Sequence, residues 1–197
     1  MQRERVSDFA IVRGFNTLSK MYHLFDTIKA ESAKTCVEIG VFGGRTLIPM
    51  ALACLETEGN VIGIDPWSAV EAAQPEIPFR TDDIDYDGLY HDLVVLLERE
   101  GLTNVSLVRA TSFNAVSMFS DGSIDFLHID GNHSRDKVYQ DVTDYLPKVK
   151  FGGVIVMDDV GFATVAPALE YLCRRCVLMG ECRIGGRDDM TFRKEDV

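Results

Sequence analysis

The sequence predicts an α/β fold, a doubly wound and mostly parallel sheet of seven strands that ends in an antiparallel hairpin. Along 197 residues, five short and continuously apolar runs alternate with longer stretches of helical periodicity. Such runs are typical of strands buried on both faces of a parallel sheet, and their alternation with helices implies crossover connections. Two further strand-like runs follow each other across a glycine-containing turn. The length suits one domain, residues 1–197.

The elements are expected in the following order. Residues 1–34 form an N-terminal helical segment, because apolar residues recur there every three or four positions, at Ile11, Phe15, Leu18, Tyr22, Phe25 and Ile28. The parallel strands are expected at Cys36–Ile39, Val61–Ile64, Val105–Val108, Ile124–Ile129 and Val154–Met157, with helices between them over about 45–57, 86–100, 134–147 and 163–174. The hairpin is expected to pair Cys176–Arg183 with Met190–Arg193.

One connection is longer than the fold requires. Residues 69–87 contain two prolines and several acidic residues, where about two to six residues would suffice. We expect this segment to be a lid over a binding site, and a plain disordered loop is the alternative.

Composition excludes several classes of protein. The net charge of −11 without a basic stripe argues against a nucleic-acid partner, and no apolar run is long enough to span a membrane. The N-terminus is charged and lacks the apolar core of a secretion signal. Five cysteines, with only one C-x-x-C pair at Cys173 and Cys176, favour reduced and packed thiols over a zinc site. We expect a cytoplasmic protein that acts on a small molecule; a homo-oligomer is compatible with the sequence.

The strongest functional motif is Val37-Glu38-Ile39-Gly40-Val41-Phe42-Gly43-Gly44-Arg45-Thr46. A predicted strand ends at Gly40 and a helix begins after Gly44, so the backbone can approach a ligand closely and offer free N–H groups. The glycine pattern G-x-x-G-G departs from the G-x-G-x-x-G of dinucleotide sites. Glu38 would repel a pyrophosphate, whereas it suits the ammonium group of S-adenosylmethionine (SAM).

Further residues extend this candidate cofactor site. Asp65 ends the second strand 27 residues after Glu38, close to the offset of an acid that binds both ribose hydroxyls; a helix-capping or surface role is the alternative. Trp67 is expected either to stack on adenine or to pack under the lid. Thr111 and Ser112 follow the third strand near the adenine edge, and Ser112 is equally suited to capping a helix. The full set of candidate cofactor residues is Glu38, Gly40, Phe42, Gly44, Thr46, Asp65, Trp67, Thr111, Ser112 and Asp130.

Four motifs together carry a family resemblance. The patterns E-x-G-x-x-G-G-x-T, I-D-P-W, F-L-H-I-D-G-N-H and M-D-D, spread over about residues 35–193, resemble class I SAM-dependent methyltransferases with a Rossmann-like fold. The similarity is closest to the catechol O-methyltransferase-like and macrocin O-methyltransferase-like branch. The resemblance implies that Glu38, Gly40 and Asp65 hold the methionine and ribose parts of SAM.

Three carboxylates follow the fourth and fifth strands, and both strands should open on one crevice. Asp130, Asp158 and Asp159 would repel one another there without a cation, and oxygen ligands suit Mg²⁺ first, then Mn²⁺ or Ca²⁺. The resemblance also implies metal ligands at these positions, although catechol-type enzymes usually carry Asn where Asp159 stands. The alternative is that Asp158 and Asp159 are loop residues of a metal-free methyltransferase.

His133 is the candidate catalytic base. It lies three residues after Asp130. In the families that the sequence resembles, catechol-type enzymes carry a lysine at this place, and histidine is familiar there in the macrocin-like branch. Capping of the next helix is the alternative role. His128, inside an apolar strand, is expected to be a hydrogen-bonded core residue. The sequence thus predicts a SAM-dependent, metal-assisted O-methyltransferase acting on a small hydroxylated molecule. The alternatives are a nucleotide-dependent oxidoreductase on the same architecture and a non-catalytic SAM-binding protein.

Overall fold

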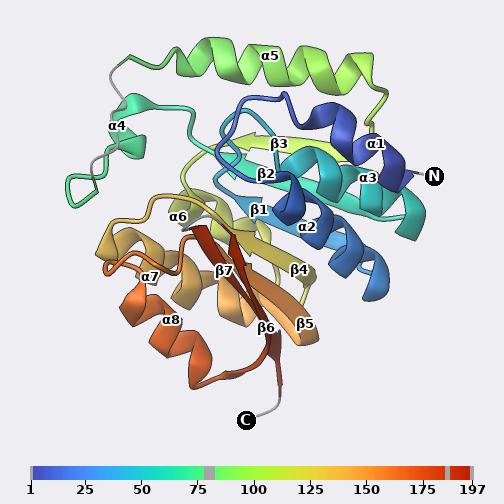
Figure 1. Ribbon diagram of the computed structural model, residues 1–197. Coiled ribbons are helices and arrows are strands. Elements are labelled where there is room, and N and C mark those ends of the chain that lie inside the picture. The colour runs from blue at the N-terminus through green and yellow to red at the C-terminus, as the bar shows by residue number, and fades with distance from the viewer. Residues whose placement is uncertain (1, 78–82, 185–186, 196–197) are drawn as a thin grey trace.

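The computed structural model describes residues 2–77, 83–184 and 187–195, and these form a seven-stranded sheet between two layers of helices (Figure 1). The strand order is β3-β2-β1-β4-β5-β7-β6. Strands β1 to β5 pair in parallel, and β7 lies antiparallel to both β5 and β6. The predicted fold class is therefore confirmed. The strands are β1 (Thr35–Ile39), β2 (Asn60–Asp65), β3 (Val105–Arg109), β4 (Ile124–Ile129), β5 (Val149–Met157), β6 (Cys176–Ile184) and β7 (Arg187–Lys194).

Helices cover both faces of the sheet (Figure 1). One face carries α1 (Gln2–Arg5), α2 (Leu18–Ala30), α3 (Leu47–Thr57) and α5 (Tyr86–Arg99), and the other carries α6 (Ser112–Ala115), α7 (Arg135–Tyr145) and α8 (Ala166–Cys173). No helix among the described residues has both the length and the apolar content that crossing a membrane requires.

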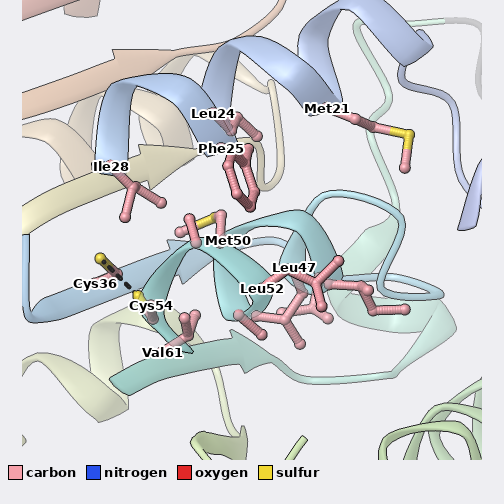
Figure 2. Packing of buried hydrophobic residues seen from close by; sticks show 14 of the residues in the cluster. Met21, Leu24, Phe25, Ile28, Cys36, Leu47, Met50, Leu52, Cys54 and Val61 are labelled. Carbon is pink, nitrogen blue, oxygen red and sulfur yellow. Dashed lines mark hydrogen bonds between the residues drawn. The ribbon is translucent and has the colours of Figure 1, made fainter. Parts of the chain in front are cut away.

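The strands divide their side chains between the two helical layers because successive strand residues point to opposite faces. In β5, Val154 and Val156 pack toward α2 and α3, while Ile155 and Met157 pack toward α7 and α8. Figure 2 shows the first layer, in which Met21, Leu24, Phe25 and Ile28 of α2 lie over Met50 and Leu52 of α3. Cys36 and Cys54 are buried beside each other in this layer, with 3.4 Å between their sulfur atoms.

The N-terminal helix is shorter than its periodicity predicts. Helix α2 begins at Leu18, after the N-cap Thr17, whose side chain accepts a hydrogen bond from the Lys20 amide. Ile11 is 93 % exposed, so it does not continue the apolar stripe. The reason is a long-range contact. The Arg45 guanidinium donates hydrogen bonds to the carbonyls of Ala10 and Gly14, so these carbonyls are not used for the hydrogen bonds of a helix.

The segment predicted as a lid has ordered structure in its first half. Helix α4 (Ala69–Ala72) lies within it, and residues 78–82 lie outside the described part of the chain. Asn132 Nδ2 donates hydrogen bonds to the carbonyls of Glu71 and Ala73, at 2.9 and 3.0 Å, and the His133 amide donates to Gln74 Oε1 at 3.1 Å. Residues 69–77 are thus tied to the loop that follows β4.

Candidate active site

A cavity of about 290 Å³ lies at the carboxyl ends of the parallel strands. The sheet order reverses between β1 and β4, and ligands of doubly wound sheets bind at such a switch point. Of the predicted site residues, Gly40, Phe42, Thr46, Asp65, Thr111, Ser112, Asp130, His133 and Asp159 line the cavity. Glu38, Gly44, Trp67 and Asp158 lie outside its wall among the described residues.

The switch point requires a glycine at position 40. Gly40 has a φ of +86°, and a Cβ atom there would lie 2.0 Å from the carbonyl oxygen of Asp130. The two loops are joined at this place, because the Asp130 amide donates to the Ile39 carbonyl at 2.8 Å and the Gly40 amide donates to Ile64. The motif glycine therefore allows the loops after β1 and β4 to touch.

Asp65 holds the loop that follows β1. Its Oδ2 accepts hydrogen bonds from the amides of Val41 and Phe42, at 3.0 and 2.9 Å, and its Oδ1 accepts from the Trp67 amide at 2.7 Å. Burial raises the pKa of Asp65, and the three backbone hydrogen bonds oppose that rise without cancelling it. This carboxylate thus connects the ends of β1 and β2 and also faces the cavity.

Trp67 lies behind the same loop. Its side chain is buried, its Nε1 donates to the Phe42 carbonyl at 2.8 Å, and its ring stands edge-on to Tyr90 at 4.9 Å between centroids. In this position it supports the backbone of the cavity wall from the core side.

The loop after β3 and helix α7 form another wall. Thr111 is the N-cap of α6, and its hydroxyl accepts a hydrogen bond from the Asn114 amide, so the cap is Thr111 rather than Ser112. The Ser112 hydroxyl donates instead to the Asp141 carboxylate. Burial raises the pKa of Asp141 to about 7, against the lowering effect of Ser112. Sequence reasoning missed Asp141, although its place between Val138 and Val142 on the apolar face of a predicted helix was a usable signal.

Glu38 and His128 form a buried pair beneath the cavity floor. Both side chains are fully buried, and His128 Nδ1 lies 2.9 Å from Glu38 Oε1. His128 is therefore the hydrogen-bonded core residue that the sequence predicted. The other carboxylate oxygen of Glu38, Oε2, has no hydrogen-bond partner among the described residues.

The three predicted metal ligands occupy two levels. Asp130 and Asp159 line the cavity, whereas the Asp158 side chain is 1 % exposed and lies deeper, in an ion pair with the ammonium of Lys20. Burial and the nearby Asp158 raise the pKa of Asp130 well above its ordinary value. Burial would also raise the pKa of Asp158, but Lys20 and His128 outweigh it and lower that pKa.

Lys20 is the second residue that sequence reasoning missed. It lies on α2 at positions four and eight before Leu24 and Ile28, so it belongs to the buried stripe of that helix. A lysine in an apolar stripe was the available signal, but its partner is 138 residues away in the chain.

His133 lies between the two cavity-lining acids. Its Nε2 is 3.8 Å from Asp130 Oδ1 and 3.8 Å from Asp159 Oδ2. Burial lowers the pKa of His133, and the carboxylates oppose this without reversing it. The N-cap of α7 is Ser134, so His133 does not take the capping position.

Two groups of three side chains could hold a metal ion among the described residues. They are His128, Asp130 and Asp158, and Asp130, His133 and Asp159, each with its ligand atoms within 4.8 Å of one another. The trio expected from the sequence, Asp130, Asp158 and Asp159, does not form such a group in the described part of the chain.

Comparison with known proteins supports one family. Residues 37–160, more than half of the chain, match the model described as a methyltransferase domain. A flavonoid 3',5'-methyltransferase of Vitis vinifera is 28 % identical over 144 residues, which cover 73 % of this chain and 54 % of that relative, so the chain spans about half the length of this curated protein.

Solved structures of methyltransferases share the fold. The O-methyltransferase from Bacillus cereus in complex with SAH has a TM-score of 0.69 and 16 % identity over 98 % of this chain and 90 % of its own. The O-methyltransferase TomG from Streptomyces achromogenes, in complex with SAM, has a TM-score of 0.69 and 14 % identity over 98 % and 87 %. With the family match and the cavity at the switch point, the chain belongs to the methyltransferase domain family.

Proposed function

We propose that this protein transfers a methyl group from SAM to a hydroxyl group of a small molecule. The observation that carries the proposal is that Asp65 and His133 line the same cavity. Asp65 ends β2 and binds the amides of the glycine loop that follows β1, and His133 lies between two acids in the loop that follows β4. A nucleoside-binding acid and a proton acceptor therefore face the same space, as transfer to an acceptor requires. The named relatives bind SAM or SAH or act on a flavonoid, which agrees with this assignment.

Residues in and around the glycine loop would bind the cofactor. Asp65, which already accepts three backbone amides, would accept one hydrogen bond from a ribose hydroxyl, and Thr111 and Ser112 would border the adenine. Glu38 would serve the ammonium of the methionine part through its unpartnered Oε2, by way of water, because the carboxylate lies beneath the cavity wall.

His133 would act as the general base. When bound, SAM would supply an electrophilic methyl group for the acceptor oxygen, and its sulfur would keep the electrons of the broken bond. His133 Nε2 takes the proton that the hydroxyl loses. Because burial lowers the pKa of His133, its imidazole is neutral and ready to accept a proton near pH 7. Asp130 and Asp159, 3.8 Å away, then stabilise the imidazolium that forms.

The surroundings of Asp130 and Asp158 are poorly suited to the divalent cation that the sequence predicts at Asp130, Asp158 and Asp159. The Lys20 ammonium is already paired with Asp158 Oδ1, and Asn16 Nδ2 donates to Asp130 Oδ2 at 2.8 Å. Protein N–H donors therefore already bind one oxygen of each of these two carboxylates, and the Lys20 ammonium brings a positive charge that a divalent cation would have to approach.

A metal-assisted reaction is a second candidate, supported by the group of Asp130, His133 and Asp159. One nitrogen and two carboxylates suit Mn²⁺ or another first-row metal better than Mg²⁺. A metal there would bind His133 and lower the pKa of an acceptor hydroxyl. Chelation separates the two candidates: methyl transfer that continues in EDTA leaves His133 as the base, whereas transfer lost in EDTA and restored by Mn²⁺ favours the metal.

The proposed function is tested by cofactor binding and turnover. Calorimetry with SAM should give Glu38→Ala and Asp65→Ala variants a weaker affinity by about ten- to hundredfold, because hydrogen bonds to charged groups contribute about 1.5–3 kcal/mol. Asp92→Ala, which removes an exposed acid of α5, is the matched control and should bind as the wild type does. Unchanged affinity in both site variants would contradict the placement.

Turnover on a panel of catechols, phenols and hydroxylated sugars completes the test. A mass increase of one methyl group with SAH release is expected. SAM binding without transfer to any member favours a non-catalytic SAM-binding protein, and binding of NADH in place of SAM favours an oxidoreductase.

A further inference from the structure

Lys20 is buried where a lysine is rarely found. Its side chain is 3 % exposed, it extends from the apolar face of α2, and its ammonium pairs with Asp158, which is 1 % exposed. Lysine is almost never buried without a partner, and an unpaired charge at such a depth is strongly destabilising. The buried ion pair between Lys20 and Asp158 is therefore a structural part of the floor of the site.

The surroundings of this ammonium are strongly acidic. Asp130 from the end of β4, Asp158 from the end of β5 and Asp189 from β7 all act on Lys20, and their attraction outweighs burial and raises its pKa. Both oxygens of Asp189 are buried and have no hydrogen-bond partner among the described residues. His128 Nε2 lies 3.9 Å from Asp158 on the other side. Lys20 thus supplies positive charge to carboxylates from three strands.

The same short stretch of chain also engages the cavity-lining acid. Asn16, the residue directly before the N-cap Thr17 of α2, donates a hydrogen bond from its side-chain amide to Asp130 Oδ2 at 2.8 Å. Asp130 and Asp158 are consequently both bound by donors from residues 16–20. A divalent cation shared by these two acids would have to displace a buried lysine and an amide together.

We infer that Lys20 is a tethered counter-cation, which takes the place of a divalent metal between Asp130 and Asp158. The ammonium keeps one permanent positive charge against these carboxylates, so the floor of the site keeps its geometry without an ion from solution. Lys20 lies outside the cavity wall and touches no reacting atom, so its part is to hold the acids. This inference rests on the proposed function only in taking methyl transfer as the reaction at this site; the pairing of Lys20 with the acids does not depend on it.

The experiment measures Mn²⁺ binding by electron paramagnetic resonance, together with thermal unfolding with and without Mn²⁺, and so does not require turnover. Wild-type protein should show no Mn²⁺ site that depends on Asp158. Lys20→Met keeps an unbranched side chain only one heavy atom shorter and removes its charge, which leaves the buried Asp158 carboxylate unpaired, so it should unfold at a lower temperature. It should bind Mn²⁺ at least about tenfold more tightly than the wild type, and Mn²⁺ should restore part of its stability.

Two matched variants control for a simple packing effect. Lys20→Arg keeps the positive charge and should gain no Mn²⁺ site. The double variant Lys20→Met with Asp158→Asn removes both charges, so it should recover stability relative to Lys20→Met and should lose the Mn²⁺ site. If Lys20→Met fails to fold, the comparison of wild type with Asp158→Asn still decides the matter.

Two results would overturn the inference. The first is tight Mn²⁺ binding by the wild type that Asp158→Asn abolishes. The second is a folded Lys20→Met variant with no Mn²⁺ site. Either result leaves the proposed methyl transfer untouched, because loss of that function would appear as absent SAM binding or absent product in the wild type.

Discussion

Replacing Asp141 by asparagine should stabilise the protein, and the gain in unfolding free energy should increase with pH. Asp141 is 5 % exposed on α7, and burial raises its pKa to about 7 from an ordinary value of 3.8. Below the ordinary value both folded and unfolded chains hold the proton. As pH rises the unfolded chain releases the proton first, so folding loses stability until pH passes the folded pKa. The whole loss is about 4 kcal/mol.

Asparagine has the same shape and cannot ionise, so Asp141→Asn escapes this loss. Its Oδ1 can still accept the hydrogen bond from Ser112. The difference in unfolding free energy between variant and wild type should increase by about 2.5 kcal/mol between pH 5 and pH 8. Urea unfolding, followed by circular dichroism at half-unit steps of pH, measures that difference directly.

Asp136→Asn is the matched control, because it removes an exposed acid from the first turn of the same helix. Its difference from wild type should stay nearly constant over the same pH range. A flat profile for Asp141→Asn as well would refute the reasoning and show that water reaches the Asp141 carboxylate.

Two further predictions concern the switch point and the base. Gly40→Ala and Gly101→Ala both place a side chain at positive φ, but only the Cβ atom at position 40 would meet backbone, 2.0 Å from the Asp130 carbonyl oxygen. Gly40→Ala should therefore lose SAM binding and cooperative unfolding. Gly101→Ala, the matched control, should lose only about 1 kcal/mol of stability. His133→Asn should lower kcat by about 10²–10⁴ and leave SAM affinity within a few-fold; a kcat close to that of the wild type would assign hydroxyl activation to another group.

The sheet was predictable because its signals are local. Apolar runs buried on both faces locate the strands, and β4 has the bounds that the sequence predicts, Ile124–Ile129. The glycine loop and Asp65 were equally accessible, since each follows directly from a strand end. The start of α2 was not, because the contacts of Arg45 with residues 10 and 14 end the helical pattern from a distance.

The acidic cluster shows the limit of reading strand ends alone. Asp158 and Asp159 are neighbours in the chain, yet one lies beneath the cavity and the other lines it, because successive side chains at a strand end point in opposite directions. A positive φ of 52° at Asp159 adds a turn there. Lys20 then pairs with the deeper acid, and nothing in the local sequence around Asp158 indicates that partner.

The hydrogen bonds of Asp65 have a consequence for the kinetics of ligand capture. Its Oδ2 already accepts two amides and its Oδ1 accepts one, so the carboxylate has one lone-pair direction left for an incoming hydroxyl. The conformation of residues 41–42 is therefore set when the chain folds, before any ligand arrives. A ligand does not have to order this loop, which removes an entropy cost from association. Ligand binding at this wall should follow the kinetics of docking to a rigid surface. The binding signal should be a single exponential, and its observed rate constant should rise linearly with ligand concentration.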